Sequence, residues 1–293
     1  AQLRVGEQAE LTERRDEIRN SERIVRGVGE AVTLLQGDED NGGAITAVSV
    51  AAESLEQAAR YAPSLSNVAE HVRDMMRKDK VKGSFGCGGI TGYFVDMLEE
   101  GLFEALFDVQ CFDLKAVESI GRNRKHQEMT AGTYANPFNC GSVVDRLDCA
   151  ILSATEVDVD FNVNVNTESM GYLLHNTGGH CDVAAGAKLA IVVAPAIRGR
   201  LPIVRDAVTT ITTPGETVGV VVTERGIAVN DRLPELKAEL IRMRAPVKDI
   251  RQLRDEVYAI TGVPKPIEFE DKVVGLIEYR DGSIIDVVRQ VRR

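Results

Sequence analysis

The stretch Lys188-Leu189-Ala190-Ile191-Val192-Val193-Ala194 decides the fold class of this chain. Every residue after the lysine is apolar, so the segment is typical of a β-strand that is covered on both faces. Such strands occur in parallel sheets, whose crossover helices pack on the two sides. The stretch therefore predicts an α/β protein with an open sheet flanked by helices.

A different strand pattern precedes it, between Glu156 and Asn166. Apolar residues alternate strictly with polar ones there, which predicts a strand buried on one face only. Asp281-Gly282 between two apolar runs is a strong signal for an antiparallel hairpin, so the sheet structure is expected to be mixed. Further strands are predicted at Gly219–Thr223, Pro246–Val247 and Asp271–Tyr279, and helices at Tyr93–Glu100, Leu233–Met243 and Ile250–Ile260.

The composition excludes several classes of protein. The 293 residues include 35 Lys and Arg against 45 Asp and Glu, a formal net charge of −10, with no tryptophan and 5% aromatic residues. This balance argues against nucleic-acid binding, which needs cations to neutralise phosphates and aromatic rings to stack on bases. No apolar run approaches the ~20 residues of a membrane-spanning helix. The charged first residues give no secretory signal, and five cysteines without CxxC spacing suit reduced thiols in the cytoplasm.

Proline and glycine divide the chain into two parts. Residues 1–63 form a head whose role the sequence does not assign, with a glycine loop near 36–44. Pro63 breaks the segment before it, and Ser64 or Ser66 then caps a helix. Residues 64–293 are expected to form the main α/β domain.

Three glycine-rich segments are candidate ligand loops: Gly37–Gly43, Gly86–Gly92 and Gly178-Gly179. Glycine lets the backbone approach a ligand closely, and a loop that opens into a helix presents free N–H groups to an anion. Gly86–Gly92 fits this geometry best, although its spacing matches neither the dinucleotide nor the phosphate-loop motif. By glycine content alone, it is either a ligand loop or a plain tight turn.

A second candidate site follows the alternating strand. Glu168 and His180 are residue types that serve as nucleophile and base, but a solvated loop and a turn beside a glycine pair explain them more simply. The run His180-Cys181-Asp182 is unsuited to a metal because consecutive side chains on an extended chain point apart. No metal site is therefore expected.

Two further groups of polar residues are candidates for substrate recognition. Asn162, Asn164 and Asn166 share the polar face of the alternating strand, which either binds a polyoxygenated substrate or faces solvent. The segments Tyr134–Pro137 and Arg198-Gly199-Arg200 could each bind a carboxylate, since arginine binds one through two hydrogen bonds.

Taken together, several segments resemble the alpha chains of citrate lyase, the citrate CoA-transferase subunits. The resemblance runs in one order from about Met75 to the end of the chain, which corresponds to the C-terminal half of that family's longer chain. Before it, Leu35-Gln36-Gly37 with Asn41–Ala44 is similar to the family's glycine loop, with Asp38–Asp40 as an insertion. The segments that carry the resemblance are Gly88–Gly92, Leu106–Asp113, Tyr134–Pro137, Asp158–Val165, Gly178–Asp182, Ile191–Arg200, Thr223–Asn230 and Glu278–Val288.

The resemblance implies a CoA-transferase type of α/β domain and a cytoplasmic citrate lyase complex. Its alpha chain exchanges acetyl for citrate on the thioester of an acyl carrier protein, which gives citryl carrier protein and acetate. The implied partners are the beta chain and the gamma chain, which is the carrier, within an oligomer. No tightly bound cofactor is implied, because the dephospho-CoA-type arm of the carrier, or CoA, takes part as substrate.

The resemblance also suggests how the site works. Related acetyl-CoA hydrolases and transferases carry a covalent glutamate, and the corresponding place here, Gly88–Thr91, has no carboxylate. This absence favours a mechanism without a covalent glutamyl intermediate, in which a citrate carboxylate attacks the acetyl thioester and a mixed anhydride forms. The protein would then supply positioning and oxyanion stabilisation.

The residues expected to do this fall into two sets. The catalytic set consists of Gly88, Gly89, Gly178 and Gly179, whose N–H groups stabilise the oxyanion, with His180 as a polar orienter. The set expected to bind substrate or thioester is Gln36, Gly42, Gly43, Ile90, Thr91, Gly92, Asn136, Asn162, Asn164, Glu168 and Asp182.

Two alternatives remain open. The first is another acyl-CoA transferase or thioester hydrolase of the same fold, in which Glu168 carries an acyl or CoA group. The second is a half subunit that docks the carrier without turnover.

Overall fold

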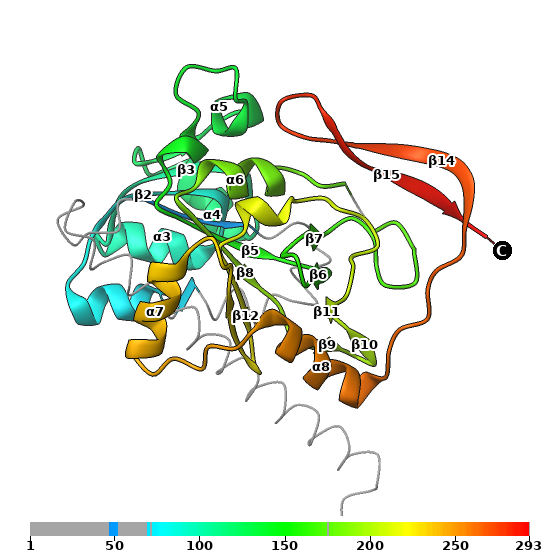
Figure 1. The fold of residues 1–293 in the computed structure, drawn as a ribbon. Helices are drawn as coiled ribbons and strands as arrows, with labels where there is room; N and C mark the ends of the chain where they lie inside the picture. The colour runs from blue at the N-terminus through cyan, green and yellow to red at the C-terminus, as the bar shows by residue number, and fades with distance from the viewer. Residues whose placement is uncertain (1–46, 52–68, 71, 175, 293) are drawn as a thin grey trace, which may run out of the picture.

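An eight-stranded sheet forms the centre of the molecule (Figure 1). The structure is a computed structural model that describes residues 47–51, 69–70, 72–174 and 176–292. All neighbouring strands of the sheet are parallel except the last pair, in which β13 runs antiparallel to β12. The predicted mixed α/β fold is therefore confirmed. The strands are, in spatial order, β13 (Gly226–Val229), β12 (Val220–Thr223), β8 (Leu189–Val193), β5 (Cys149–Ser153), β1 (Ala47–Ala51), β2 (Gly83–Ile90), β3 (Phe103–Cys111) and β4 (His126–Glu128).

The strand order reverses beside β1. The chain first adds β2, β3 and β4 on one side of β1 and then returns to its other side to add β5, β8 and β12. β1 falls within residues 1–63, which the sequence separated as a head, yet it pairs with both β2 and β5. Residues 47–51 therefore belong to the main sheet, and a boundary at residue 63 does not separate them from it.

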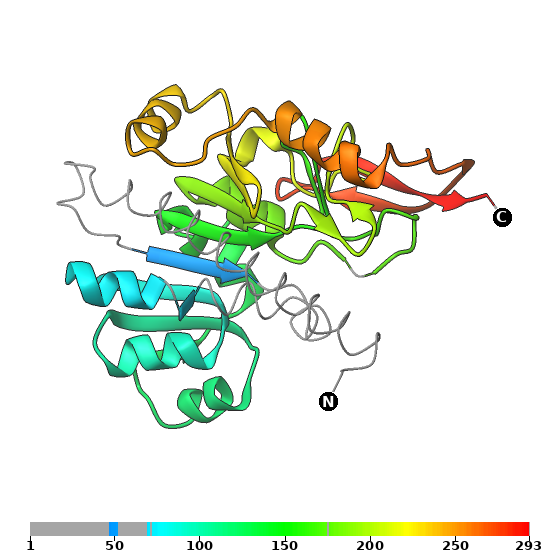
Figure 2. The same cartoon turned by 90° about the horizontal axis from the view of Figure 1, so that it is seen from below.

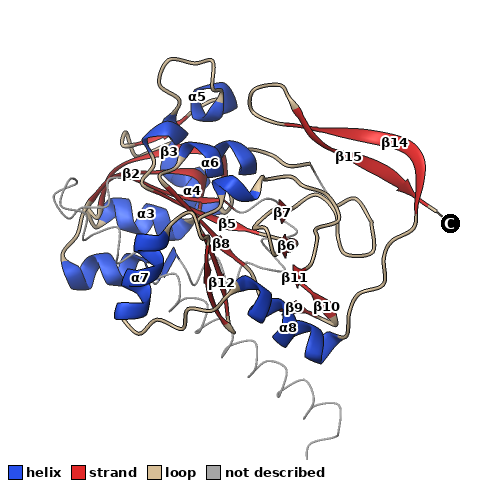
Figure 3. Ribbon diagram, in the orientation of Figure 1, coloured by secondary structure: helices blue, strands red, loops and turns tan. Residues whose placement is uncertain are grey.

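Helices cover both faces of the sheet (Figure 3). Along β8, Leu189, Ile191 and Val193 enter one apolar core, whereas Ala190 and Val192 enter the other. The apolar run that decided the fold class is thus covered on both sides, as predicted. The first core is closed by the helix that includes residues 72–79, α3 (Gly92–Glu99), α4 (Leu114–Ile120) and α7 (Pro234–Arg242), and the second by α5 (Ala131–Ala135), the 3-10 helix η2 (Val143–Arg146), α6 (His180–Gly186) and α8 (Ile250–Thr261).

The prediction of a glycine loop at Gly86–Gly92 is wrong for the residues up to Ile90, which lie in strand β2. A Cβ atom on Gly86 would lie 2.7 Å from the Phe94 ring, and one on Gly89 would lie 1.8 Å from the Phe112 ring. These glycines make room for aromatic rings on the strand. Gly88, with a φ of +99°, lies where the register with β3 shifts.

The segment Glu156–Asn166 is not one strand buried on a single face, so that prediction is wrong. It folds into β6 (Glu156–Asp158) and β7 (Val163–Asn164), which pair antiparallel, and β11 (Val204–Arg205) joins β6 in a small three-stranded sheet. The Asp158 carboxylate accepts the N–H groups of Asp160 and Asn162 at 3.0 and 2.9 Å and so holds the turn. The polar residues of both strands are buried because they bond to one another and to a later loop rather than to solvent.

The C-terminal hairpin and the helices of this half match their predictions, whereas the strand predicted at Pro246–Val247 does not form. β14 (Phe269–Glu278) and β15 (Ile284–Val291) form the antiparallel hairpin that extends along the body in Figure 2, and Gly282 in its turn has a φ of +85°. The helices expected near α3, α7 and α8 are present. Pro246–Val247 contributes only a single bridge, between Ile227 and Val247. The remaining short elements are β9 (Ile197–Arg198), β10 (Leu201–Pro202) and η3 (Gly215–Thr217).

Among the residues that the structure describes, no helix is long and apolar enough to cross a membrane. The glycine loop expected near residues 36–44 lies outside the described residues.

The contact between Gly89 and Phe112 predicts a stability change. Gly89→Ala should lower the free energy of unfolding by about 1–3 kcal/mol, because the added methyl group overlaps the ring. Urea unfolding followed by circular dichroism measures this loss. The matched control is Gly121→Ala, whose Cβ would lie 3.7 Å from its nearest neighbour, the Glu118 carbonyl oxygen. Equal stability of the two variants would contradict the packing role of Gly89.

Candidate functional site

The carboxyl edge of the sheet, beside the reversal at β1, is the candidate site. Open α/β sheets bind ligands outside the carboxyl ends of their strands, at the point where the strand order reverses. Here β2 ends at Ile90, β5 at Ser153 and β8 at Val193. The segments that follow these strands, together with the start of α6, contain most of the described candidate residues.

The end of β2 is closed by a carboxylate of the protein itself. Asp113 Oδ2 accepts the Gly92 N–H at 2.6 Å, and Oδ1 accepts the Ala116 N–H at 2.9 Å. One carboxylate therefore caps the N-termini of both α3 and α4. The Ile90 side chain lies in the apolar core, and Thr91 Oγ1 is buried with no hydrogen-bond partner among the described residues. The Gly92 N–H predicted to meet a substrate is already bonded.

Gly178, Gly179 and His180 form the entrance to α6, a helix that the sequence analysis did not predict, so the extended chain expected at His180-Cys181-Asp182 is wrong. Gly178 has a φ of +54°. Gly179 is the N-cap residue of α6, so no N-cap side chain caps this helix. A Cβ on Gly179 would lie 3.5 Å from the Tyr134 ring. The backbone of this turn therefore runs close beside an aromatic side chain.

His180 is buried and joins the first turn of α6 to the end of β5. Its Nε2 lies 2.9 Å from the Ser153 carbonyl oxygen, and its Nδ1 lies 2.6 Å from Thr213 Oγ1. A carbonyl oxygen only accepts, so Nε2 carries a proton and donates it. His180 therefore orients the turn through hydrogen bonds to the protein.

The two predicted glycine pairs share one edge of the sheet without touching. Gly88 is the register partner of Val50 in β1, and Val50 is the register partner of Ile151 in β5. Two strand spacings, roughly 10 Å, therefore separate Gly88 from β5, whose end His180 contacts.

Asn162 and Asn164 lie in a buried network rather than on an open face. Asn162 donates to Asp158 at 3.1 Å and accepts the Gly215 N–H at 2.9 Å. Asn164 donates to Glu156 at 2.8 Å and accepts from Thr210 at 3.0 Å. Glu156 also pairs with the Arg205 guanidinium. These amides therefore hold the small sheet together. Asn164 lies beside Thr155, just after β5, whereas Asn162 is bonded to Gly215, ahead of β12.

The other candidates lie at three places. Asp182 is half-buried in the first turn of α6, and burial raises the pKa of its carboxyl above the usual 3.8, although the positive charge of Arg280 opposes this shift. Glu168 closes its own turn by accepting the Met170 N–H at 3.0 Å, and that turn packs against Val291 of β15. Asn136 is exposed and caps a local turn through the Phe138 N–H. Gln36, Gly42 and Gly43 lie outside the described residues.

Two charged residues, Arg198 and Glu224, also lie at the carboxyl edge of the sheet. Arg198 Nη2 donates to the carbonyl oxygen of Ala154, just after β5, at 3.0 Å. Glu224, just after β12, accepts the Ala196 N–H at 2.8 Å. The basic cluster around Arg198 was visible in the sequence, whereas no periodicity or motif singled out Glu224 or Asp113.

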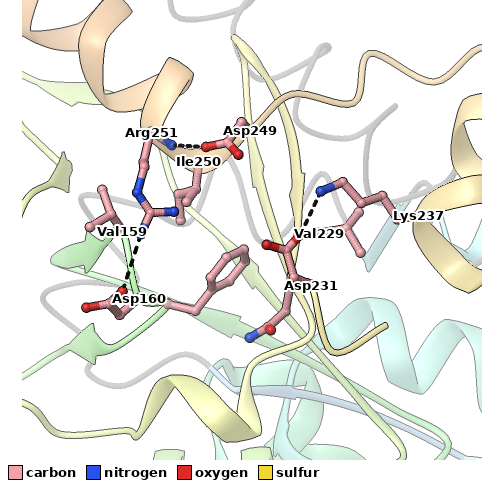
Figure 4. Close-up of a pocket in the computed structure, with 10 residues that line it drawn as sticks. Val159, Asp160, Val229, Asp231, Lys237, Asp249, Ile250 and Arg251 are labelled. Atoms are coloured by element: carbon pink, nitrogen blue, oxygen red, sulfur yellow. Dashed lines mark hydrogen bonds and ion pairs between the residues drawn. The ribbon is translucent and has the colours of Figure 1, made fainter. Parts of the chain in front are cut away.

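A separate pocket of about 210 Å³ lies between the β6–β7 turn, the end of β13 and the start of α8 (Figure 4). Its charged side chains pair with one another, Lys237 with Asp231 at 2.7 Å and Arg251 with Asp160 at 3.7 Å. Val229, which lines it, pairs with Val220, the first residue of β12. The pocket therefore lies toward the opposite edge of the sheet and is distinct from the candidate site.

The described residues hold no group of three or more His, Cys, Asp or Glu side chains that could hold a metal. Burial raises the pKa values of Cys111, Cys149 and Cys181 to about 12. Thiols with such pKa values stay protonated near neutral pH, and only a thiolate is a good nucleophile. These three cysteines are therefore unsuited to accept an acyl group.

The doubly wound mixed sheet and its polar carboxyl edge define an α/β protein of the class that binds ligands at strand ends. Comparison with known proteins gives the family, because a family profile described as citrate lyase, alpha subunit (CitF), matches residues 55–291. The chain belongs to the citrate lyase alpha subunit family.

Individual relatives agree. The chain is 48% identical over 225 residues to the citrate lyase alpha chain of Escherichia coli (strain K12). The aligned residues cover 77% of this chain and 44% of the relative. It also matches the crystal structure of a citrate lyase alpha subunit from Streptococcus mutans in complex with citrate, with a TM-score of 0.85 and 41% identity over 94% of this chain and 51% of that one. The chain therefore spans about half the length of the relatives it matches.

A more distant match concerns the fold alone. RipA from Yersinia pestis superposes with a TM-score of 0.55 at 14% identity, over 82% of this chain and 52% of that chain.

The thiol environments predict an order of alkylation. Cys140 is exposed and should react with iodoacetamide before Cys111, Cys149 and Cys181, whose pKa values of about 12 leave little thiolate. Peptide mass spectrometry at mildly alkaline pH measures the order. In denaturant all of these cysteines should react alike, and early modification of Cys111 in the folded chain would refute the assignment.

The half-buried carboxyl of Asp182 predicts a pH dependence of stability. Because burial raises its pKa in the folded chain, its contribution to stability is present below the unfolded pKa and is lost as the pH rises through the folded value. Asp182→Asn lacks this loss, so its free energy of unfolding relative to wild type should increase as the pH rises from about 4 to about 7. Urea unfolding at both pH values measures the difference, and a constant or shrinking difference would contradict the expectation.

Proposed function

We propose that this chain supplies the CoA-transferase-type half of a citrate CoA-transferase, which exchanges acetyl for citrate on the thioester of an acyl carrier protein. The observation that carries this proposal is the family match over residues 55–291. The relative from Streptococcus mutans, whose structure contains citrate, supports citrate as the acid.

The exchange needs two balanced acyl-transfer steps. A citrate carboxylate oxygen attacks the acetyl thioester carbonyl, the C–S bond breaks and the carrier thiolate departs. The product of this first step is a mixed anhydride of acetate and citrate. The thiolate then attacks the citryl carbonyl of that anhydride, and acetate leaves. The chain would contribute oxyanion stabilisation by N–H groups and positioning of the two reactants.

The proposed route has no covalent glutamyl intermediate. Two carboxylates at this edge already accept backbone hydrogen bonds, Asp113 from two helix N-termini and Glu224 from Ala196. The Glu168 carboxylate accepts the Met170 N–H within its own turn, which packs against β15. Gly178, Gly179 and His180, at the end of β5, are the group that we propose for the oxyanion.

Arg198 is the proposed contact for a citrate carboxylate. Its hydrogen bond to the Ala154 carbonyl oxygen fixes one end of the guanidinium at the carboxyl edge of β5. Arginine has five N–H donors in a planar fork and binds carboxylates through two of them, which suits a guanidinium at this edge to a citrate carboxylate.

The implied surroundings are those of the family. The carrier's dephospho-CoA-type arm, or CoA, would enter as a substrate and not as a resident cofactor. The beta chain and the gamma carrier chain would be partners in a cytoplasmic oligomer.

A turnover assay tests the proposal. The purified chain is incubated with citrate and acetyl-dephospho-CoA, alone and with the beta and gamma chains, and mass spectrometry follows citryl thioester and acetate. Arg198→Met should raise the KM for citrate by about tenfold or more, as expected when a charged hydrogen-bonding partner is lost, with a smaller change in the KM for the thioester. Arg200→Met, on the same turn, is the matched control.

The outcomes separate the alternatives. Free thiol and acetate without citryl thioester would indicate a hydrolase, and an acyl or CoA adduct on Glu168 would indicate the covalent route. Carrier binding without product in any mixture would favour a docking subunit. Equal KM values for citrate in Arg198→Met and wild type would remove Arg198 from the site.

A further inference from the structure

The tip of the C-terminal hairpin lies over the entrance to α6, although about a hundred residues separate the two segments (Figure 1). Arg280 in this tip donates from Nη2 to Asp145 Oδ1 of η2 at 3.3 Å. Its charge also reaches Asp182 and Cys181 in the first turn of α6, where it opposes the rise that burial causes in the pKa of each group. The guanidinium is thus hydrogen-bonded to η2, and its charge acts on the first turn of α6.

The environment of Arg280 is unusual for an arginine in a turn. Its side chain is only 13% exposed, and its Nε is buried without a hydrogen-bond partner in the described part of the chain. A buried guanidinium depends on nearby acids and acceptors, here the hydrogen-bonded Asp145 and the charge of Asp182. The tip is therefore held by charge at this point.

The two elements that Arg280 joins are themselves tightly packed. A Cβ on Gly186 of α6 would lie 2.8 Å from a Val144 side-chain atom in η2. The hairpin turn is rigid, because Asp281 Oδ1 accepts both the N–H and the hydroxyl of Ser283, and the Tyr279 N–H donates to the Ser283 carbonyl oxygen at 2.7 Å. Asp145, which anchors the tip, therefore lies next to Val144, and Val144 packs against α6, the helix that the Gly178–His180 turn enters.

We propose that Arg280 is a positioning residue, which holds the hairpin tip against the first turn of α6 and so fixes the Gly178–His180 turn for thioester exchange. This inference rests on the proposed function for its catalytic consequence. It extends the site to the C-terminal hairpin, which contributes no residue to the edge of the sheet. The chemistry depends on where the N–H groups point, and small displacements of such groups lower rates strongly.

The test compares Arg280→Met with Arg292→Met. Arg292 lies at the other end of the same hairpin, where it is 62% exposed and pairs with Glu268 at 3.7 Å, so it matches the change in chemistry without the contact to η2. Arg280→Met should lower kcat for exchange by on the order of 100-fold with little change in either KM, because substrate contacts remain. Arg292→Met should behave as wild type.

A second measurement does not depend on activity. Cys181 lies in the α6 turn and is 3% exposed, so release of the tip should increase its rate of alkylation in Arg280→Met but not in Arg292→Met. Arg280→Lys, which keeps the charge, should restore part of both kcat and protection. If Arg280→Met does not fold, Asp145→Ala removes the same contact from the exposed side and should show both effects more weakly.

The outcomes distinguish the two proposals. Absence of exchange in wild type under every condition would refute the proposed function, and Cys181 alkylation would then still decide whether Arg280 fixes the turn. Equal alkylation and equal kcat in folded Arg280→Met and Arg292→Met would overturn the inference. A fall in kcat without partial rescue by lysine or any gain in Cys181 reactivity would also overturn it.

Discussion

The rest of the structure depends on the burial of the parallel sheet on both faces. Strands β5, β8 and β12 send alternate side chains into two apolar cores, and each fully buried valine, leucine or isoleucine contributes roughly 1.5–3 kcal/mol to folding. Polar chemistry is therefore displaced from the faces to the ends of the strands. This displacement explains why His180, Arg198, Glu224 and Asp113 all lie in segments beside strand ends or helix starts.

The sequence predicted the elements whose signals are local. The apolar run at 188–194, the helices near 234–242 and 250–261 and the hairpin at Asp281-Gly282 each carry their own pattern, and each is present. β1 carried no comparable signal, because five residues of mixed character become a central strand only through pairing with β2 and β5. Whether such a segment becomes a strand is decided by pairing with segments that are distant in the sequence.

Two errors have the same physical origin. Glycine in Gly86–Gly92 is equally compatible with a loop and with a strand, and the Phe94 and Phe112 rings, which come later in the chain, decide between them. Alternation in Glu156–Asn166 correctly indicated extended backbone, but a polar residue is not necessarily exposed. Glu156 and Asn164 are buried because Arg205, Thr209 and Thr210 supply their hydrogen bonds from about fifty residues away. The candidate site shows the same limit, since Asp113 and Arg280 gain their roles only from tertiary contacts.

The two edges of the eight-stranded sheet have a consequence for the behaviour of the protein at high concentration. β4 has three residues and β13 has four, so the described sheet ends on both sides in strands with few unpaired N–H and C=O groups. Long, flat edges can recruit a strand from another molecule and so start aggregation, and short edges limit this. The sheet can therefore remain wide without offering a template for fibril-like growth.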